Sequence, residues 1–441
     1  MLHERIPNLA KLVEPDRVNK AVYTDPQLFD LEMQRIHERH WIYCGHESQV
    51  KKPGDYYTVQ IGRQPMIMVR DADQKVNVLY NRCPHRGNMI CGDRSGNTGE
   101  FFRCSYHSWT FHHDGKLRTI PMMESGYQGT KMSRDNPDCN MKRAARVENY
   151  RGFVFASLAK DGPSLGEFLG ASKIAFDDMC DRAPEGEVEI VPNCFRVIQN
   201  SNWKIFLENQ LDALHPSVVH QSTGRAAMDV EKQIRDKTGH APLSYHMLSA
   251  FASVTIDKWD GFQTLNYPWG HCILTGYMGL RPTDPDTLAY EKVMHKRYGK
   301  QRTEEILGVN IHHVLIYPGL SVQSPLQQLR AVRPLGVDRT LTEIWHFRLK
   351  GAPEPIYRRS LAYYNLVNSP ATLINADDLE NFWKCQQGLG SAGGDWVNFQ
   401  RHYGRDVEKN GVIETGPNMG TSEAPMRNQM KAWSQYMTAE K

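Results

Sequence analysis

The sequence lacks the features that would place a chain in or across a membrane. No stretch approaches the ~18 consecutive apolar residues of a membrane span. The first residues, Met1 to Pro7, also lack the continuous apolar segment of a secretory signal. We therefore expect a cytoplasmic protein, in which the nine cysteines are not paired in disulfides.

An excess of charge of one sign is also missing. Fifty-three basic and fifty acidic residues give a net charge of +3, and no block of like charge occurs. Because nucleic-acid-binding proteins usually carry a basic face or arm, we predict no nucleic-acid partner. The chain also contains no internal repeat, no low-complexity tract and no glycine-rich dinucleotide-binding fingerprint.

Two kinds of secondary-structure pattern are present. Residues 20–50 have apolar side chains at roughly helical spacing, which predicts a helical segment that ends near Gly45. From about 50 to 157 the pattern predicts a small all-β module, with strands at 65–70, 76–80 and 152–156. The remainder predicts an α+β domain, with a helix after the N-cap residue Asn202, strands at 311–317, 320–323 and 341–349, and helices at 356–368, 377–389 and after Ser422.

The strongest local signal is a pair of short Cys/His segments inside the β-rich module. Cys83-Pro84-His85-Arg86-Gly87 is followed by Cys104-Ser105-Tyr106-His107. Together they supply two thiolates and two imidazoles, which can hold a binuclear iron–sulfur centre with the thiolates on one iron and the imidazoles on the other. A structural zinc site uses the same four ligands, but zinc fingers usually group the cysteines in one segment and the histidines in the other. The mixed segments favour the iron–sulfur centre.

A second candidate metal site follows the helix that begins after Asn202. Asp212 and His215 are three residues apart and share a helix face, whereas His220 lies five residues beyond His215. Pro216 predicts a break that lets the two imidazoles converge. Two imidazoles and one distant carboxylate form the facial triad of non-heme Fe(II) oxygenases, and the carboxylate is expected from Asp377 or Asp378.

Each of these residues also has an ordinary structural explanation. A histidine on a helix is usually a surface or hydrogen-bonded core residue, and paired aspartates usually mark a solvated helix start. We assign His112-His113 and His312-His313 to that structural class. His215 and His220 do not belong to that structural class, because the stretch from Asn202 to His220 that contains them lies downstream of the two Cys/His segments.

The two patterns together resemble the large subunit of Rieske-type aromatic ring-hydroxylating oxygenases, especially the benzoate-, salicylate- and terephthalate-type members. The resemblance extends over nearly the whole chain. It implies a helix-grip-like α+β catalytic domain with a central antiparallel sheet at 161–441, a Rieske [2Fe–2S] domain at 41–160, and an N-terminal helical segment at 1–40 that packs on the catalytic domain.

The resemblance also assigns roles to residues. It implies that the cluster ligands are Cys83, His85, Cys104 and His107, and that mononuclear Fe(II) is held by His215, His220 and Asp378, with Asp378 chosen over Asp377. Asp212 is implied to link His107 of one subunit to His215 of the next and so to carry electrons between them. Asn209 and Gln210 are the expected substrate-binding residues. The polar Gln210 lies where members acting on hydrocarbons tend to have an apolar residue.

The expected reaction is hydroxylation of an aromatic carboxylic acid with O2, by cis-dihydroxylation or monohydroxylation. Electrons would come from NAD(P)H through a separate reductase, with or without a ferredoxin, and the subunits would form a homotrimer or an α3β3 assembly. Action on an aromatic hydrocarbon, or demethylation, is an alternative within the same family. A Rieske electron carrier with an inert second domain and a zinc-stabilised binding protein are alternatives from other classes.

Overall fold

The computed structural model describes residues 8–241, 243–276, 281–416 and 419–439. Its contacts divide the chain into two compact units, one formed by residues 33–168 and the other by residues up to Glu32 together with those from Leu169 onward. None of the helices in these described ranges is long and apolar enough to cross a bilayer. The domain borders expected from the sequence, 40/41 and 160/161, stay a prediction.

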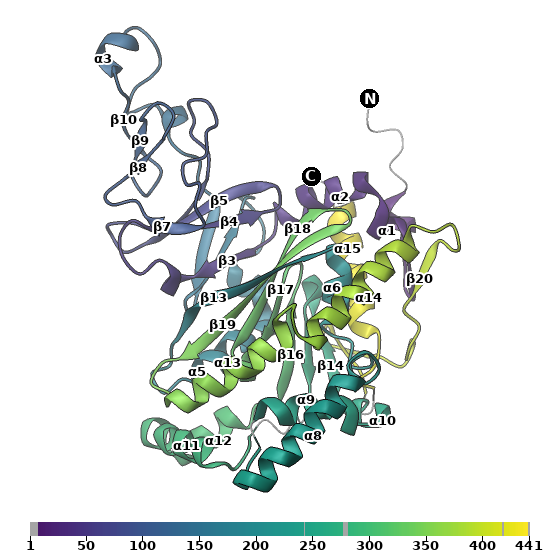
Figure 1. The fold of residues 1–441 in the computed structure, drawn as a ribbon. Helices are drawn as coiled ribbons and strands as arrows, with labels where there is room; N and C mark the ends of the chain where they lie inside the picture. The colour runs from purple at the N-terminus through teal and green to yellow at the C-terminus, as the bar shows by residue number, and fades with distance from the viewer. Residues whose placement is uncertain (1–7, 242, 277–280, 417–418, 440–441) are drawn as a thin grey trace. The chain divides into compact units, whose positions relative to one another are not determined.

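Unit 33–168 contains three small antiparallel sheets (Figure 1). Their strand orders are β6-β5-β4-β7, β10-β9-β8 and β11-β12-β3. The strands are β3 (Ile42–His46), β4 (Asp55–Ile61), β5 (Gln64–Arg70), β6 (Val76–Tyr80), β7 (Ser95–Asn97), β8 (Phe102–Arg103), β9 (Thr110–Phe111), β10 (Leu117–Thr119), β11 (Arg146–Tyr150) and β12 (Phe153–Ser157). Short helical turns lie at η2 (Met33–His37), η3 (Glu47–Gln49), α3 (Met123–Gly126) and η4 (Pro137–Cys139), and α4 (Leu165–Leu169) ends this part of the chain.

The predicted helix at 20–50 is too long. Helical structure is present in α1 (Ala21–Thr24), α2 (Pro26–Glu32) and η2, but Ile42–His46 forms the strand β3. This strand pairs with β12, and all five of its residues are buried. These residues form a strand because β12, over 100 positions away, supplies the partner for their backbone hydrogen bonds. Helical periodicity in the sequence does not reveal such a distant contact.

The second unit is built on a nine-stranded antiparallel sheet with strand order β13-β19-β18-β17-β16-β15-β14-β22-β21. Its strands are β13 (Val188–Gln199), β14 (Gln263–Asn266), β15 (Cys272–Thr275), β16 (Ile311–Ile316), β17 (Leu320–Gln323), β18 (Gln328–Gly336), β19 (Arg339–Leu349), β21 (Val407–Lys409) and β22 (Val412–Glu414). A separate small sheet contains β1 (Val13–Glu14), β2 (Arg17–Asn19) and β20 (Trp396–Asn398). The predicted central antiparallel sheet is thereby confirmed.

Helices pack on this sheet, with α13 and α14 lying along one of its faces in Figure 1. The helices of eight or more residues are α5 (Ile174–Asp181), α8 (Gln221–Thr238), α9 (Leu243–Ser253), α11 (Pro285–Tyr298), α12 (Lys300–Leu307), α13 (Glu354–Asn368), α14 (Leu373–Leu389) and α15 (Ala424–Thr438). Shorter ones are α6 (Trp203–Asn209), α7 (Pro216–Val219) and α10 (Ile256–Trp259), with single turns at η1 (Leu9–Lys11), η5 (Gly170–Lys173), η6 (Pro268–Gly270) and η7 (Ser324–Leu326). The strands and helices predicted in this part of the chain lie at these positions, with ends shifted by a few residues.

A buried carboxylate joins three helices of this unit. Glu32, at the end of α2, accepts hydrogen bonds from Lys204 Nζ at 2.5 Å, Trp203 Nε1 at 2.9 Å and Trp433 Nε1 at 2.6 Å. The Lys204 and Glu32 side chains are 1% and 0% exposed. Because a buried charge is tolerated only with a partner and full hydrogen bonding, this group fixes how α2, α6 and α15 pack together.

Candidate metal centres and substrate cavity

The two Cys/His segments form loops with the same backbone pattern. In each loop the cysteine N–H donates to the carbonyl of the residue five positions later, at 2.8 Å for both Cys83 and Cys104. The N–H of the residue four positions after the cysteine donates to the cysteine carbonyl, at 2.9 Å for Gly87 and 3.0 Å for Ser108. That residue has a positive φ, 76° at Gly87 and 58° at Ser108. The glycine therefore occupies a position that its lack of a Cβ favours.

The loops bring their four candidate ligands together, with the two cysteines on the buried side and the two histidines on the outer side. The thiols of Cys83 and Cys104 contact each other and are buried, at 1% and 2% exposure. The rings of His85 and His107 lie 4.6 Å apart between centroids and are only half-buried. The sulfur side of the site thus faces the core of the module, and the imidazole side lies at its surface.

The two thiols differ in acidity. Burial raises the pKa of Cys83 to about 11. Burial also raises the pKa of Cys104, but backbone N–H groups of Tyr106 and His107 and the side chain of Asn88 outweigh it, so the pKa of Cys104 is lowered. Asn88 Nδ2 lies 3.6 Å from the Cys104 sulfur. N–H groups directed at a sulfur favour its thiolate form, which is the form that binds iron.

These residues fit a Rieske cluster. The donor set is two sulfurs on the buried side and two imidazoles on the outer side, as such a cluster requires. In the described part of the chain, the buried Nδ1 atom of His107 has no hydrogen-bond partner. A buried unpaired ring nitrogen is costly unless it binds something, which agrees with a role as a metal ligand.

The second site lies where the chain changes direction after α6. The position predicted for the helix break, at Pro216, was wrong: α6 ends at Asn209, His215 has helical φ and ψ, and Pro216 is the first residue of a new helix, α7. Asp212 accepts a hydrogen bond from the N–H of Leu214 at 2.9 Å, a local bond that competes with helix continuation. His215 precedes α7 and His220 lies between α7 and α8, so each side chain projects from a helix junction.

Three ligand atoms converge on one point. Nε2 of His215 lies 3.7 Å from Oδ1 of Asp378, and Nε2 of His220 lies 3.3 Å from the same oxygen. One ligand atom from each of these residues falls within 4.8 Å of the others, a separation that a metal ion can span. Asp378 lies in α14, more than 150 positions from the histidines, and its side chain is 18% exposed. Two imidazoles and one carboxylate are the donor set of a non-heme iron centre with open positions.

The outward nitrogen of each imidazole has its own carboxylate. Nδ1 of His220 lies 3.4 Å from Asp377 Oδ2, and Nδ1 of His215 lies 3.8 Å from Asp212 Oδ2. Burial lowers the pKa of His220, but the contacts with Asp378 and Asp377 raise it more, so it lies above its ordinary value. Carboxylates in this position orient a ligating histidine and make it more basic.

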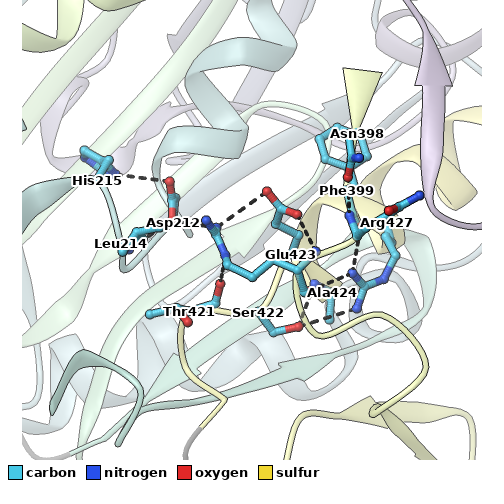
Figure 2. Close-up of polar contacts among 12 residues, drawn as sticks. Asp212, Leu214, His215, Asn398, Phe399, Thr421, Ser422, Glu423, Ala424 and Arg427 are labelled. Carbon is cyan, nitrogen blue, oxygen red and sulfur yellow. Dashed lines mark hydrogen bonds and ion pairs between the residues drawn. The ribbon is translucent and has the colours of Figure 1, made fainter. Parts of the chain in front are cut away.

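Asp212 also contacts the C-terminal part of the chain. Figure 2 shows its carboxylate between His215 and the segment that contains Thr421 and Glu423. Arg401 Nη2 lies 3.2 Å from Asp212 Oδ1 and 3.6 Å from Glu423 Oε1. Burial raises the pKa of Asp212, but His215 and Arg401 outweigh it and lower the pKa below its usual range. Asp212 is therefore held as an anion.

Comparison with known proteins matches two family models to the chain. The family model of the Rieske [2Fe–2S] domain matches residues 40–147. The family model of the ring-hydroxylating alpha subunit (catalytic domain) matches residues 181–439. The chain is 34% identical to the toluate 1,2-dioxygenase alpha subunit of Pseudomonas putida, over 89% of this chain and 84% of that protein. The chain belongs to the family of Rieske ring-hydroxylating alpha subunits.

A second relative and a solved structure are also similar to this Rieske oxygenase, the structure in its fold. It is 30% identical to the 2-halobenzoate 1,2-dioxygenase large subunit of Burkholderia cepacia, over 87% of this chain and 80% of that protein. The fold is similar to that of a naphthalene 1,2-dioxygenase with indole bound in the active site, with a TM-score of 0.81 and 22% identity over 97% of this chain and 94% of that chain. The predicted fold class, enzyme class and cofactors, a Rieske [2Fe–2S] cluster and mononuclear iron, are thereby confirmed.

The oxygenase has a cavity of about 320 Å³ beside the three convergent residues. His215, His220 and Asp378 line it, as do Asn209 and Gln210, the expected substrate-binding residues. Gln210 Oε1 accepts from Ser321 Oγ at 3.3 Å, and Gln210 Nε2 donates to Asn209 Oδ1 at 3.1 Å. Much of the remaining wall is apolar and includes Met247, Phe251, Val254, Trp259, Phe262 and Leu274.

Two histidines that sequence reasoning set aside also line this cavity. His312 and His313 were expected to have a structural role only, yet both face the cavity. Leu274 pairs with His313 and the next residue of β15, Thr275, pairs with Ile311, so His312 is an extra residue in β16. Such a β-bulge lets two successive side chains share one face of a sheet. Burial lowers the pKa of His312 to about 3, so its ring is neutral.

Arg330 is a further cavity residue that the sequence did not single out. It lies in β18 at 6% exposure, and its guanidinium contacts the side chains of Gln323 and Asn368. A charged residue inside the apolar run Leu329-Arg330-Ala331-Val332 is the signal that marks it, because arginine is seldom buried without a specific partner.

Proposed function

We propose that this chain is the large subunit of a terminal oxygenase that hydroxylates an aromatic carboxylic acid. The observation that carries the proposal is the opening of the His215–His220–Asp378 group onto a largely apolar cavity with a few polar side chains. A cavity of about 320 Å³ has the size and character of a site for a small aromatic compound. The relatives named for toluate and 2-halobenzoate support an acid rather than a hydrocarbon.

The relatives' names favour dihydroxylation. Both are called 1,2-dioxygenases, and we propose that both atoms of O2 enter the ring. The balanced reaction joins one aromatic acid, one O2, one NADH and one proton to give one cis-dihydrodiol and NAD+. Bound iron supplies O2 activation when reduced, and the cluster supplies one of the electrons.

The individual residue roles are part of the proposal. We assign Cys83, His85, Cys104 and His107 to the cluster and His215, His220 and Asp378 to the iron. Asp378 is preferred over Asp377 because Asp378 faces both Nε2 atoms, whereas Asp377 contacts the outward nitrogen of His220. Asn209 and Gln210, on the same wall as the iron site, are assigned to substrate orientation.

Electron delivery requires partners. We propose a homotrimer or an α3β3 assembly, in which His107 of one subunit donates to Asp212 of its neighbour. The half-exposed imidazole of His107 and the 24% exposed side chain of Asp212 support an encounter between subunits. A separate NAD(P)H-dependent reductase, with or without a ferredoxin, would reduce the cluster. We place the system in the cytoplasm, where the nine free cysteines would stay reduced.

Product analysis tests the function. The chain, coexpressed with its small subunit if one is required, would be supplied with a surrogate reductase, NADH and 18O2. Benzoate, salicylate, toluate and naphthalene would be compared as substrates. The proposal expects an acid to be converted faster than naphthalene, with two 18O atoms in the product. Turnover of naphthalene alone, or loss of a methyl group as the main reaction, would contradict it.

A further inference from the structure

Arg330 is a buried cation that forms no ion pair within 4 Å among the described residues, and the carboxylate that acts on it electrostatically is that of Asp378, at longer range. Three arginines are buried in the described part of the chain, at 4–8% exposure. Arg182 pairs with Asp178 at 3.0 Å and Arg333 pairs with Glu343 at 3.3 Å. Among the described residues the hydrogen-bond acceptors of Arg330 are neutral, with Nε and Nη2 donating to Asn368 Oδ1 at 3.2 and 3.0 Å and Nη1 donating to Gln323 Oε1 at 3.3 Å.

The guanidinium has spare hydrogen-bond donors. An arginine side chain has five N–H groups, and the contacts with Asn368 and Gln323 use three of them. One N–H on each of Nη1 and Nη2 has no partner among the described residues. Two N–H groups on one guanidinium match the two oxygens of a carboxylate, and a bound anion would offset part of the cost of burying the positive charge of Arg330.

Arg330 also stands apart from the other basic groups of the cavity. His312 and His313 are neutral because burial lowers the pKa of both rings, that of His312 to about 3. Lys258 and His246 line the cavity as well, but their side chains are exposed. Within the part of the chain that the structure describes, Arg330 is thus the buried permanent cation on the cavity wall.

The surroundings of Arg330 hold its position. Gln323 Nε2 lies 2.8 Å from His313 Nε2, and Gln328 Nε2 donates to Gln323 Oε1 at 2.6 Å. Asn368 Nδ2 donates to Gln328 Oε1 at 2.7 Å. This polar network connects β16, β17, β18 and α13, so the guanidinium is oriented before a ligand arrives. A preoriented donor loses little freedom on binding.

From these contacts we propose that Arg330 binds the carboxylate of the substrate and so selects aromatic acids. The inference rests on the proposed function and deepens it. Arg330 lines the same largely apolar cavity as the His215–His220–Asp378 group, so an acid held at Arg330 would place its ring in the cavity that these three residues line. The charge on the substrate then decides which compounds enter in the productive orientation.

The test compares an acid with an uncharged compound of the same shape. Benzoate and nitrobenzene are isosteric, and their dissociation constants would be measured by equilibrium dialysis against the reduced holoenzyme without O2. In Arg330→Gln, the dissociation constant for benzoate should rise by about 10–100-fold, whereas that for nitrobenzene should change little. Arg330→Lys should recover part of the benzoate affinity because it keeps the charge.

A second variant covers the case in which Arg330→Gln fails to fold. Gln323→Glu places an internal carboxylate beside Nη1 of Arg330, and His313 can accept the change by donating from Nε2. This variant should keep its metals and its nitrobenzene affinity but lose benzoate affinity. Lys258→Gln tests the exposed cation in the same assay and should keep the preference for benzoate over nitrobenzene.

The outcomes separate the two proposals. If the wild-type holoenzyme binds and converts no aromatic acid, the proposed function fails and the role of Arg330 fails with it. If wild type binds benzoate and Arg330→Gln and Gln323→Glu bind it equally well, only the role of Arg330 is overturned. Loss of the benzoate preference in Lys258→Gln, with retention in Arg330→Gln, would likewise overturn it and assign the carboxylate to Lys258.

Discussion

The carboxylate of Asp377 lies 3.4 Å from Nδ1 of His220, the ring nitrogen opposite the one that faces Asp378. Two adjacent aspartates of α14 therefore contact the two edges of one imidazole. This arrangement supports different proposed tasks for them: Asp378 shares the convergence point with His215, and Asp377 contacts the opposite nitrogen, where a carboxylate can orient the ring.

The first prediction separates Asp377 from Asp378. Asp378→Ala should keep the visible spectrum of the cluster but lose the mononuclear iron and turnover, because one of the three proposed ligands is gone. Asp377→Asn should keep the iron site but weaken iron binding by about 10–100-fold, since an outer partner is altered. Iron content after controlled dialysis and NADH-dependent turnover check both. Iron loss in Asp377→Asn alone would show that the ligand was assigned to the wrong aspartate.

The second prediction concerns Asp212. Asp212→Asn preserves the size of the side chain but removes the charge that links His215 to Arg401. We expect both metals to remain and turnover to fall about 10–100-fold or more. Stopped-flow reoxidation of the reduced cluster, with substrate and O2 present, should slow in parallel.

A matched control for Asp212 is available at Glu423. It contacts Arg401 at 3.6 Å but is not among the contacts of His215. Glu423→Gln should therefore leave the rate of cluster reoxidation close to that of wild type. Equal slowing in both variants would point to general damage around Arg401 rather than to a role of Asp212 in electron transfer.

The third prediction concerns the buried pair of Glu32 and Lys204. Burial lowers the pKa of Lys204 and contact with Glu32 raises it again in part, so the lysine depends on the carboxylate. Glu32→Gln should lower the free energy of unfolding by about 3–5 kcal/mol, because a buried ammonium loses its partner. Urea unfolding followed by tryptophan fluorescence measures the change.

Two further variants calibrate this result. Adding Lys204→Met to Glu32→Gln should recover much of the loss, since no unpaired charge then remains. Glu187→Gln breaks the exposed pair with Lys350, whose side chains are 69% and 38% exposed, and should change the free energy of unfolding by less than about 1 kcal/mol. A Glu32→Gln protein as stable as wild type would contradict the importance of the buried pair.

The fourth prediction is a pH dependence from Glu208. Burial raises its pKa from 4.5 to about 7, against the lowering effects of the Tyr23 hydroxyl and Lys204. The folded state therefore retains a proton that the unfolded state loses, so the stabilising contribution is complete below pH 4.5 and is lost as pH rises to about 7. The loss amounts to at most about 3 kcal/mol. Glu208→Gln should flatten this part of the stability profile, and an unchanged slope would refute the assignment.

Much of the metal chemistry could be predicted because its information is local. The loops at Cys83 and Cys104 are each completed within six residues, so their pattern can be recognised from neighbouring residues alone. The α+β architecture also follows from patterns within single strands and helices. The error at 20–50 arose where β3 depends on its partner β12 rather than on its own periodicity.

The residues of the cavity wall could not be predicted because they, too, depend on contacts between distant parts of the chain. Arg330 meets Asn368 across 38 positions, and the place of His312 depends on how β16 pairs with β15. Neither contact leaves a repeat or spacing in the sequence. The end of α6 at Asn209 was missed because the bond between Asp212 and Leu214 competes with a helix that apolar spacing alone would continue.

The extra residue at His312 has a consequence for how such an enzyme can diversify. An insertion of one residue usually reverses the orientation of everything that follows it in a strand. Here the irregularity absorbs the insertion, and pairing resumes in register on both sides. A single-codon insertion or deletion at this bulge can therefore add or remove a polar group on the cavity wall without reversing the faces of the other residues of β16.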